Sequence, residues 1–89
     1  MRAMHRTTQF KKDIQRMQRR KKCFYTFKQI IRDLARGHPL GVKHRNFPLS
    51  GTYQGTRECH IEPDWLLIYE RTDSDLYLIR TGTHLDLFR

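Results

Sequence analysis

The 89-residue sequence predicts an α+β fold, in which two N-terminal helices pack on a twisted antiparallel β-sheet. Two observations predict this class. Apolar residues recur at helical spacing in the first half of the chain, and the second half holds short apolar runs bounded by turn residues. The length allows a single domain, residues 1–89, with a core too small to enclose a large cofactor as well.

The first predicted helix follows Thr7 and Thr8, whose hydroxyls can cap a helix N-terminus. Phe10, Ile14 and Met17 then recur on one face of that helix. The opposite face is basic and carries Lys11, Lys12, Arg16, Arg19 and Arg20. We interpret residues 2–6, which precede this helix, as a short leading strand.

A second helix is predicted over residues 24–34, because its apolar residues again fall on one face. Gly37 is placed to end it, and Pro39 prevents it from continuing. Residues 38–55 are rich in glycine and proline and are interpreted as loop and turn.

The second half of the chain predicts strands. Residues 57–71 form one stretch that is interrupted at Pro63, and residues 76–79 form the return strand after a turn at 72–75. The run 66–69 is apolar on both faces, which is typical of a central strand covered on both sides. A short apolar tail at 85–88 follows.

The net charge of +9 predicts an anionic partner, either nucleic acid or an acidic protein. The content of large apolar residues is too high for a disordered basic tail. No apolar run is long enough for a membrane span or follows the N-terminus as a secretory signal would, so no membrane partner is expected. Cys23 and Cys59 lack the spacing of a disulfide or zinc framework, which favours a reduced, cytoplasmic protein.

The residues with the most chemistry lie late in the chain. A hairpin about residues 73–74 would place Arg80 opposite 66–68 and bring His84 near Asp64, with His60 close by. Imidazoles transfer protons near neutral pH, and a guanidinium stabilises a phosphate whose charge grows in the transition state. On a basic chain this set predicts metal-free RNA cleavage, in which a ribose 2′-hydroxyl attacks the neighbouring phosphate.

Two aromatic residues and the basic helix face are candidates for substrate contact. Trp65 and Phe88 could stack on a splayed base, and the basic face could bind phosphates. Each has a structural alternative: Trp65 as a core residue, Phe88 as a plug for the sheet edge, and the basic run as a solvated face. Arg80 could equally pair with Asp64 or Glu62.

Two other chemistries are disfavoured. Cys59 and His60 are neighbours on a predicted strand, so their side chains point to opposite faces, which argues against a thiol nucleophile. The spacing of His60, Asp64 and His84 on strands is not diagnostic of a metal, and no cofactor is predicted.

Three segments, taken together, carry a family resemblance: Pro-Leu-Ser-Gly at 48–51, the run from Gly55 to Tyr69 with its His-x-x-Pro-Asp-Trp piece, and Arg-Thr-Gly-Thr-His at 80–84. They resemble the YafQ branch of the RelE/ParE toxin superfamily. The resemblance implies a RelE-like fold, similar to that of small microbial ribonucleases. It also implies a bacterial type II toxin that cleaves mRNA in the ribosomal A site without a metal.

The same resemblance implies partners. These are a cognate DinJ- or RelB-like antitoxin, the ribosome with its 16S rRNA, mRNA, and operator DNA that is bound through the antitoxin complex. The positive charge predicts that the antitoxin is acidic and folds over the basic face and the His84 region.

Carried over residue by residue, the resemblance implies an acid/base group of His60, Asp64 and His84. Our hypothesis makes His84 the general acid and His60, aided by Asp64, the base. Arg80 would lie near the scissile phosphate, and Trp65 and Phe88 match aromatic positions associated with activity. Glu58 keeps a carboxylate at a position where the branch can carry an aspartate and is a further candidate for substrate contact.

One position departs from the family pattern. A histidine often precedes the Pro-Leu-x-Gly turn, and here that position is Phe47. His44 could substitute for it if the loop turned it inward. Two alternatives therefore stay open at this point: a ParE-like toxin that inhibits a topoisomerase by contact, and a ribosome- or RNA-binding module with weakened chemistry.

Overall fold

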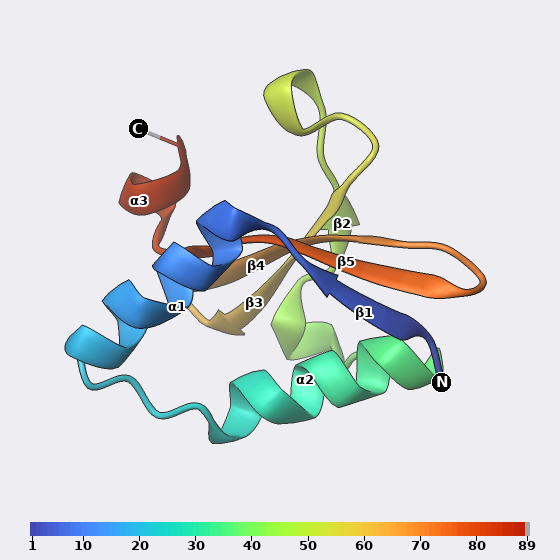
Figure 1. The fold of residues 1–89 in the computed structure, drawn as a ribbon, viewed down its shortest axis with the longest axis horizontal. Coiled ribbons are helices and arrows are strands. Elements are labelled where there is room, and N and C mark those ends of the chain that lie inside the picture. Colours follow the sequence, from blue (N-terminus) through green and yellow to red (C-terminus); the bar gives the residue numbers. More distant parts are fainter. Residues whose placement is uncertain (89) are drawn as a thin grey trace.

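The computed structural model describes residues 1–88 and confirms the α+β class. Two helices cover one face of a five-stranded sheet whose order is β1-β5-β4-β3-β2, and a short third helix lies at the C-terminal end (Figure 1). The elements are β1 Ala3–Arg6, α1 Thr8–Arg19, α2 Tyr25–Arg36, β2 Phe47–Pro48, β3 Arg57–Glu62, β4 Trp65–Arg71, β5 Asp75–Gly82 and α3 His84–Phe88. Within residues 1–88, no helix has the length and apolar character that crossing a membrane requires.

The two long helices begin and end as the sequence predicts. Thr7 caps α1, because its hydroxyl accepts a hydrogen bond from the backbone N–H of Phe10 at 3.0 Å. Helix α2 ends at Gly37, which adopts the left-handed conformation with φ of 77°. Phe10 and Met17 of α1 and Leu34 of α2 are buried against the sheet. The predicted apolar faces are therefore the faces that form the core.

Trp65, at the start of β4, is central to this core and has no exposed surface. Its ring stacks on Phe27 with 5.4 Å between the centroids, and Phe24 meets it edge-on. Its indole N–H donates to the hydroxyl of Thr81 at 2.9 Å, which satisfies the one polar atom that it buries. The side chain thus joins β4, β5 and α2.

The sheet differs from the prediction in two ways. The leading strand β1 exists, but it pairs with β5 in parallel, whereas the remaining pairs are antiparallel as predicted. Residues 38–55, interpreted as loop and turn, also contain β2 and two single turns of 3-10 helix, Val42–His44 and Gly51–Tyr53. The apolar tail forms α3, whose Leu87 packs on the second face of the sheet with Leu66 and Ile68.

Candidate functional site

The candidate residues gather on the face of the sheet that α1 and α2 leave open. Residues directly opposite one another in a sheet share a face. Glu58 of β3 pairs with Ile68 of β4, which pairs with Arg80 of β5. Two residues further along β3, and so on the same face, His60 lies opposite Leu66. Since Leu66 and Ile68 belong to the apolar cluster on the open face, Glu58, His60 and Arg80 lie on that face too.

A β-bulge sets the orientation of Arg80. The register between β4 and β5 shifts so that Tyr69 pairs with Leu78 and Ile68 with Arg80, which leaves Ile79 as the extra residue. In a regular strand Leu78 and Arg80 would share a face, but here Leu78 packs among the helices. The bulge therefore places Arg80 on the open face, opposite Ile68 as the sequence predicts.

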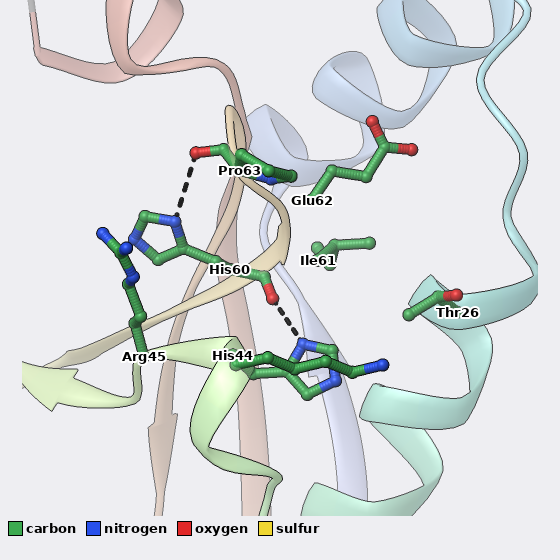
Figure 2. Close-up of a pocket in the computed structure, with 8 residues that line it drawn as sticks. Thr26, His44, Arg45, His60, Ile61, Glu62 and Pro63 are labelled. Carbon is green, nitrogen blue, oxygen red and sulfur yellow. Dashed lines mark hydrogen bonds between the residues drawn. The ribbon is translucent and has the colours of Figure 1, made fainter.

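His60 is held by two acceptors. Its Nε2 lies 3.1 Å from a carboxylate oxygen of Glu58. Its Nδ1 lies 3.3 Å from the carbonyl oxygen of Pro63 (Figure 2). The carbonyl oxygen of Pro63 can only accept a hydrogen bond, and so can the carboxylate of Glu58 when it is ionised. His60 therefore donates to both only in the form in which each ring nitrogen carries a proton. Glu58 and His60 are both buried. The two side chains thus form a buried, hydrogen-bonded pair at the floor of the site.

His84 is oriented by Asp64, as the predicted hairpin required. Its Nδ1 lies 2.7 Å from Oδ1 of Asp64, and its backbone N–H donates to the same oxygen at 3.0 Å. These two hydrogen bonds lower the pKa of Asp64, so the carboxylate stays ionised. The hypothesis that Asp64 assists His60 is wrong in geometry, because the carboxylate bonds to His84 instead.

The two imidazoles are neighbours, with 5.6 Å between the ring centroids of His60 and His84. His84 is about half exposed, while His60 is buried behind it. The Asp64 bond occupies Nδ1 of His84 and leaves its Nε2 as the nitrogen that can reach a substrate. The structure therefore brings together the predicted His60, Asp64 and His84, and adds Glu58 to them.

Arg80 finds a partner that the sequence analysis did not identify. Neither Asp64 nor Glu62 pairs with it; the partner is Asp13 of α1, which accepts from its Nε at 2.7 Å and its Nη2 at 3.2 Å. Asp13 lies in a helix that is otherwise rich in basic residues. The only sequence signal that it is buried is its helical spacing from the apolar residues of that helix. Burial alone would raise the pKa of Asp13, but hydrogen bonds from its partners outweigh it and hold that pKa below 3.8.

The two aromatic candidates separate. Trp65 cannot stack on a base in this fold, because it is wholly buried between α2 and the sheet, so the substrate-contact prediction is wrong for it and the core alternative holds. Phe88 is 42% exposed on α3, packs edge-on against Tyr53 and lies 6.4 Å from the His84 ring. Phe88 thus remains available to a base beside the histidines.

The basic face of α1 also divides. Arg16 donates to Asp13 at 2.8 Å and to the carbonyl of Thr81 at 2.7 Å. Arg20 forms a two-pronged bond with Asp86 at 2.7 and 3.0 Å. These two arginines fasten α1 to β5 and α3, so their guanidinium groups are already paired within the chain. The other three predicted contacts are exposed: Lys11, Lys12 and Arg19.

His44 does not take the place of the family histidine. Its Nδ1 bonds to the backbone carbonyl of His60 at 2.7 Å, so His44 contacts the backbone of the strand and not the His60 ring (Figure 2). Phe47 itself pairs with Glu58 across β2 and β3 and is 43% exposed. Phe47 therefore occupies the edge of the row of Glu58, Ile68 and Arg80, directly at the site.

Three residues at the floor of the site are of types that can ligate a metal ion. A carboxylate oxygen of Glu58 and ring nitrogens of His60 and His84 lie within 4.8 Å of one another, and imidazole and carboxylate ligands suit zinc or copper. The thiol of Cys59 is excluded from this group because it points into the helical core, where burial raises its pKa to about 12.

Unfolding at acid pH should show how much the paired carboxylates contribute to stability. The hydrogen bond from Arg20 holds the pKa of Asp86 below its ordinary value of 3.8. A group whose pKa is lower in the folded chain stabilises the fold above its unfolded pKa, and that stabilisation is lost as the pH falls through the folded value. We expect the urea midpoint to fall from about pH 5 downward, and to fall less in Asp86→Asn. Equal falls in the variant and the wild type would contradict this expectation.

Comparison with known proteins gives a consistent result. A family model described as "Bacterial toxin of type II toxin-antitoxin system, YafQ" matches residues 2–89. The mRNA interferase toxin YafQ of Escherichia coli K12 is 41% identical over 81 residues, which span 90% of this chain and 88% of the relative. Crystalline YafQ from strain BL21(DE3) superposes with a TM-score of 0.94 at 37% identity, over 100% of both chains. A chain of the E. coli DinJ–YafQ complex gives 0.92 at 38% identity, again over 100% of both.

Proposed function

Because the chain belongs to the YafQ family of bacterial type II toxins, we propose that it is an endoribonuclease that cleaves mRNA in the ribosomal A site. The cleavage proceeds without a metal, by attack of a ribose 2′-hydroxyl on the adjacent phosphate. The observation that carries this proposal is the Asp64–His84 pair beside the Glu58–His60 pair, on the sheet face that also presents Arg80. An acid, a base and a phosphate-binding cation are the three groups that this reaction needs.

In this mechanism His84 is the general acid. Asp64 accepts from Nδ1 of His84, which fixes the direction of the ring and leaves Nε2 as the nitrogen that gives its proton to the substrate. That proton passes to the 5′-oxygen as the bond between this oxygen and phosphorus breaks. The half-exposed position of His84 allows it to reach a substrate that lies across the site.

The Glu58–His60 pair is the base. Because His60 bonds to two acceptors, the group of the pair that can take a proton is the Glu58 carboxylate. Glu58 removes the proton of the 2′-hydroxyl, and the cationic His60 ring stabilises the developing charge on the phosphorane. The geometry thus supports a change to our hypothesis, from His60 aided by Asp64 as the base to the pair of Glu58 and His60.

Arg80 and Phe88 complete the proposed site. Arg80 and Glu58 lie on the two strands that flank Ile68. Because adjacent strands are about 4.8 Å apart, the backbones of Arg80 and Glu58 are roughly 10 Å from each other, a span that a scissile phosphate and its ribose can bridge. Arg80 binds the phosphate, while Phe88 stacks on a base next to it, which is worth about 1–3 kcal/mol in other single-strand binders.

The proposed partners follow from charge and from relatives. We propose the ribosome with its 16S rRNA, mRNA and a DinJ-like antitoxin, with operator DNA bound through the antitoxin complex, all in the cytoplasm. The net charge of +9 and the exposed Lys11, Lys12 and Arg19 favour polyanionic and acidic partners. A crystallised relative of similar length is in complex with the antitoxin DinJ, which supports a partner of that kind.

The test is primer extension on an mRNA that is being translated in the presence of purified toxin, beside the same mRNA without ribosomes. We expect cuts at codon-registered positions only in the presence of ribosomes. Cuts in both tubes would show cleavage that does not depend on the ribosome. Intact mRNA in both, with active wild-type E. coli YafQ as the positive control, would overturn the proposed activity.

Phe47 offers a gain-of-function prediction. Since Phe47 lies directly across from Glu58, Phe47→His adds an imidazole next to the proposed base. We expect the cleavage rate on ribosomes to rise by roughly 10-fold, less than the ~10²–10⁴ of an indispensable acid or base, because Glu58 already fills that role. Phe47→Leu is the matched control and should not raise the rate. A lower rate in both variants would instead identify Phe47 as a stacking surface.

A further inference from the structure

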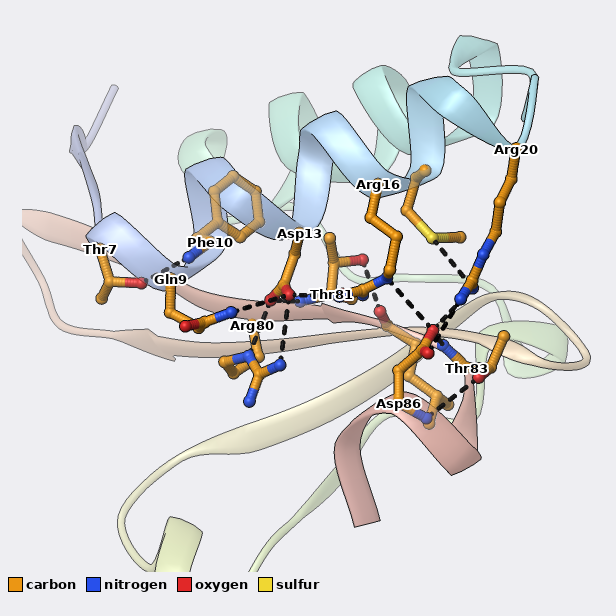
Figure 3. Close-up of polar contacts among 12 residues, drawn as sticks. Thr7, Gln9, Phe10, Asp13, Arg16, Arg20, Arg80, Thr81, Thr83 and Asp86 are labelled. Atoms are coloured by element: carbon orange, nitrogen blue, oxygen red, sulfur yellow. Dashed lines mark hydrogen bonds and ion pairs between the residues drawn. The ribbon is translucent and has the colours of Figure 1, made fainter. Parts of the chain in front are cut away.

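A buried carboxylate on the first helix holds the proposed phosphate-binding arginine. Asp13 has no exposed surface, and its two oxygens accept hydrogen bonds from the Arg80, Arg16 and Thr81 groups around it (Figure 3). The distances are 2.7 and 3.2 Å to Nε and Nη2 of Arg80, 2.8 Å to Nη1 of Arg16 and 3.1 Å to the backbone N–H of Thr81. Both oxygens of the carboxylate are thus fully engaged.

The fold brings these groups together through the edge of the sheet. Strand β1 ends at Arg6, and α1 takes its place beside β5, where the Thr7 hydroxyl donates to the carbonyl of Ile79 at 2.8 Å. The bulge at Ile79 is the feature that turns Arg80 to the open face. The start of α1 therefore meets β5 at the residue that sets the direction of Arg80, and Asp13 lies six residues further along, nearly two helical turns.

The contacts of Arg80 decide which part of its guanidinium can meet a substrate. Nε and Nη2 both point to Asp13, which closes that edge of the group. Nη1 points the other way, toward the hydroxyl of Tyr53 at 3.4 Å, on the open face. Without Asp13, the flexible side chain of Arg80 would have no fixed direction, because Tyr53 contacts a single nitrogen at a long distance.

We infer that Asp13 is a positioning residue, which fixes the Arg80 guanidinium so that Nη1 faces the scissile phosphate. The inference rests on the proposed function, in which Arg80 binds that phosphate. Asp13 does not touch the substrate; it acts through Arg80. A buried ion pair is by itself weak evidence for stability, so the location of this one behind a reacting group is what favours the positioning role.

The inference makes an unusual combination of predictions for Asp13→Asn. The Asn side chain keeps the size but removes a negative charge that lies between Arg16 and Arg80, so the site becomes more positive. Binding to ribosomes should therefore stay the same or become tighter, since phosphate attraction grows with positive charge. The single-turnover cleavage rate should fall by about 10²-fold, as expected when a reacting group is misplaced by about 1 Å.

A double-mutant cycle separates positioning from a general structural effect. If Asp13 acts through Arg80, adding Asp13→Asn to Arg80→Ala should not slow cleavage further. If the same slowing appears in both backgrounds, the inference is overturned. Asp86→Asn is the matched control: it removes another carboxylate that binds α1 arginines, without contact to Arg80, and should leave the cleavage rate within about 3-fold of wild type.

A second readout makes the inference independent of catalysis. The Nε–H of Arg80 should give an ordered, slowly exchanging NMR signal in the wild type and in Asp86→Asn, and lose it in Asp13→Asn. If the wild type cleaves no RNA, the proposed function fails, while this signal still decides whether Asp13 holds Arg80. Persistence of the signal in Asp13→Asn overturns the inference.

Asp13→Glu covers the case in which the asparagine variant does not fold. It keeps the charge but moves the carboxylate by one methylene. The carboxylate can then no longer accept from Nε and Nη2 of Arg80 in the same position. We expect the same kind of loss, about 10-fold or more in the single-turnover rate, with ribosome binding retained. Wild-type cleavage in a folded Asp13→Glu would contradict the positioning role.

Discussion

We expect His84→Gln to lower the single-turnover cleavage rate by about 10²–10⁴-fold, the usual contribution of a positioned acid. Glutamine can keep the hydrogen bond to Asp64, which His84 makes through Nδ1 at 2.7 Å, but it cannot deliver a proton. The 5′-oxygen would then leave without protonation. Bacterial growth arrest by the induced toxin should disappear together with the cleavage of mRNA.

The matched control for this change is His38→Gln, because the exposed ring of His38, just beyond α2, makes a long contact of 3.7 Å with the Asp33 carboxylate. That variant should cleave at the wild-type rate. The variants must also be shown to fold alike, which the exposure of both rings favours. A His84→Gln toxin that still cleaves within a few-fold of wild type would remove His84 from the role of acid.

The second large effect concerns stability. Trp65→Ala should lower the free energy of unfolding by about 3–5 kcal/mol, the range for a large aromatic side chain removed from a core. Trp65 has no exposed surface and stacks on Phe27, so its removal leaves a cavity between α2 and the sheet. For a small domain with about 5–15 kcal/mol of stability, such a loss is a large share of the total. Urea unfolding at neutral pH measures it.

Trp65→Phe distinguishes a core role from a substrate role. Phenylalanine keeps most of the apolar volume but loses the N–H that donates to Thr81, so we expect a smaller loss of about 1–3 kcal/mol. Cleavage by the folded fraction of Trp65→Phe should match the wild type. A stable Trp65→Phe with a strongly reduced cleavage rate would mean that the indole does meet the RNA after all.

Much of the fold follows from local patterns. The apolar faces of α1 and α2, the cap at Thr7, the stop at Gly37 and the hairpin between β4 and β5 all depend on residues close together in sequence. The parallel pairing of β1 could not be derived in this way, because it depends on which far strand leaves an edge open. Helix α3 is only five residues long, too short for a periodic pattern to show.

The same distinction between local and distant residues applies to the candidate site. His84 and Asp64 could be placed together because a single hairpin connects them. Asp13 could not, since it reaches Arg80 across 67 residues, and the bulge that turns Arg80 leaves no distinct mark in the sequence. Trp65 was assigned to the substrate because a motif associates it with activity. The motif residue acts here by burial, and a pattern of residue types does not distinguish contact from support.

The pairing of β1 with β5 bears on how the toxin comes to be active in the cell that makes it. Arg2 bonds to Thr72 across 70 residues, so this part of the sheet closes only when nearly the whole chain is available. The hairpin that carries Arg80 and leads into His84 is also synthesised late. We therefore expect the nascent chain to stay inactive on the ribosome that translates it and to finish folding slowly. We expect an antitoxin present at that moment to meet the toxin before its proposed catalytic face has formed.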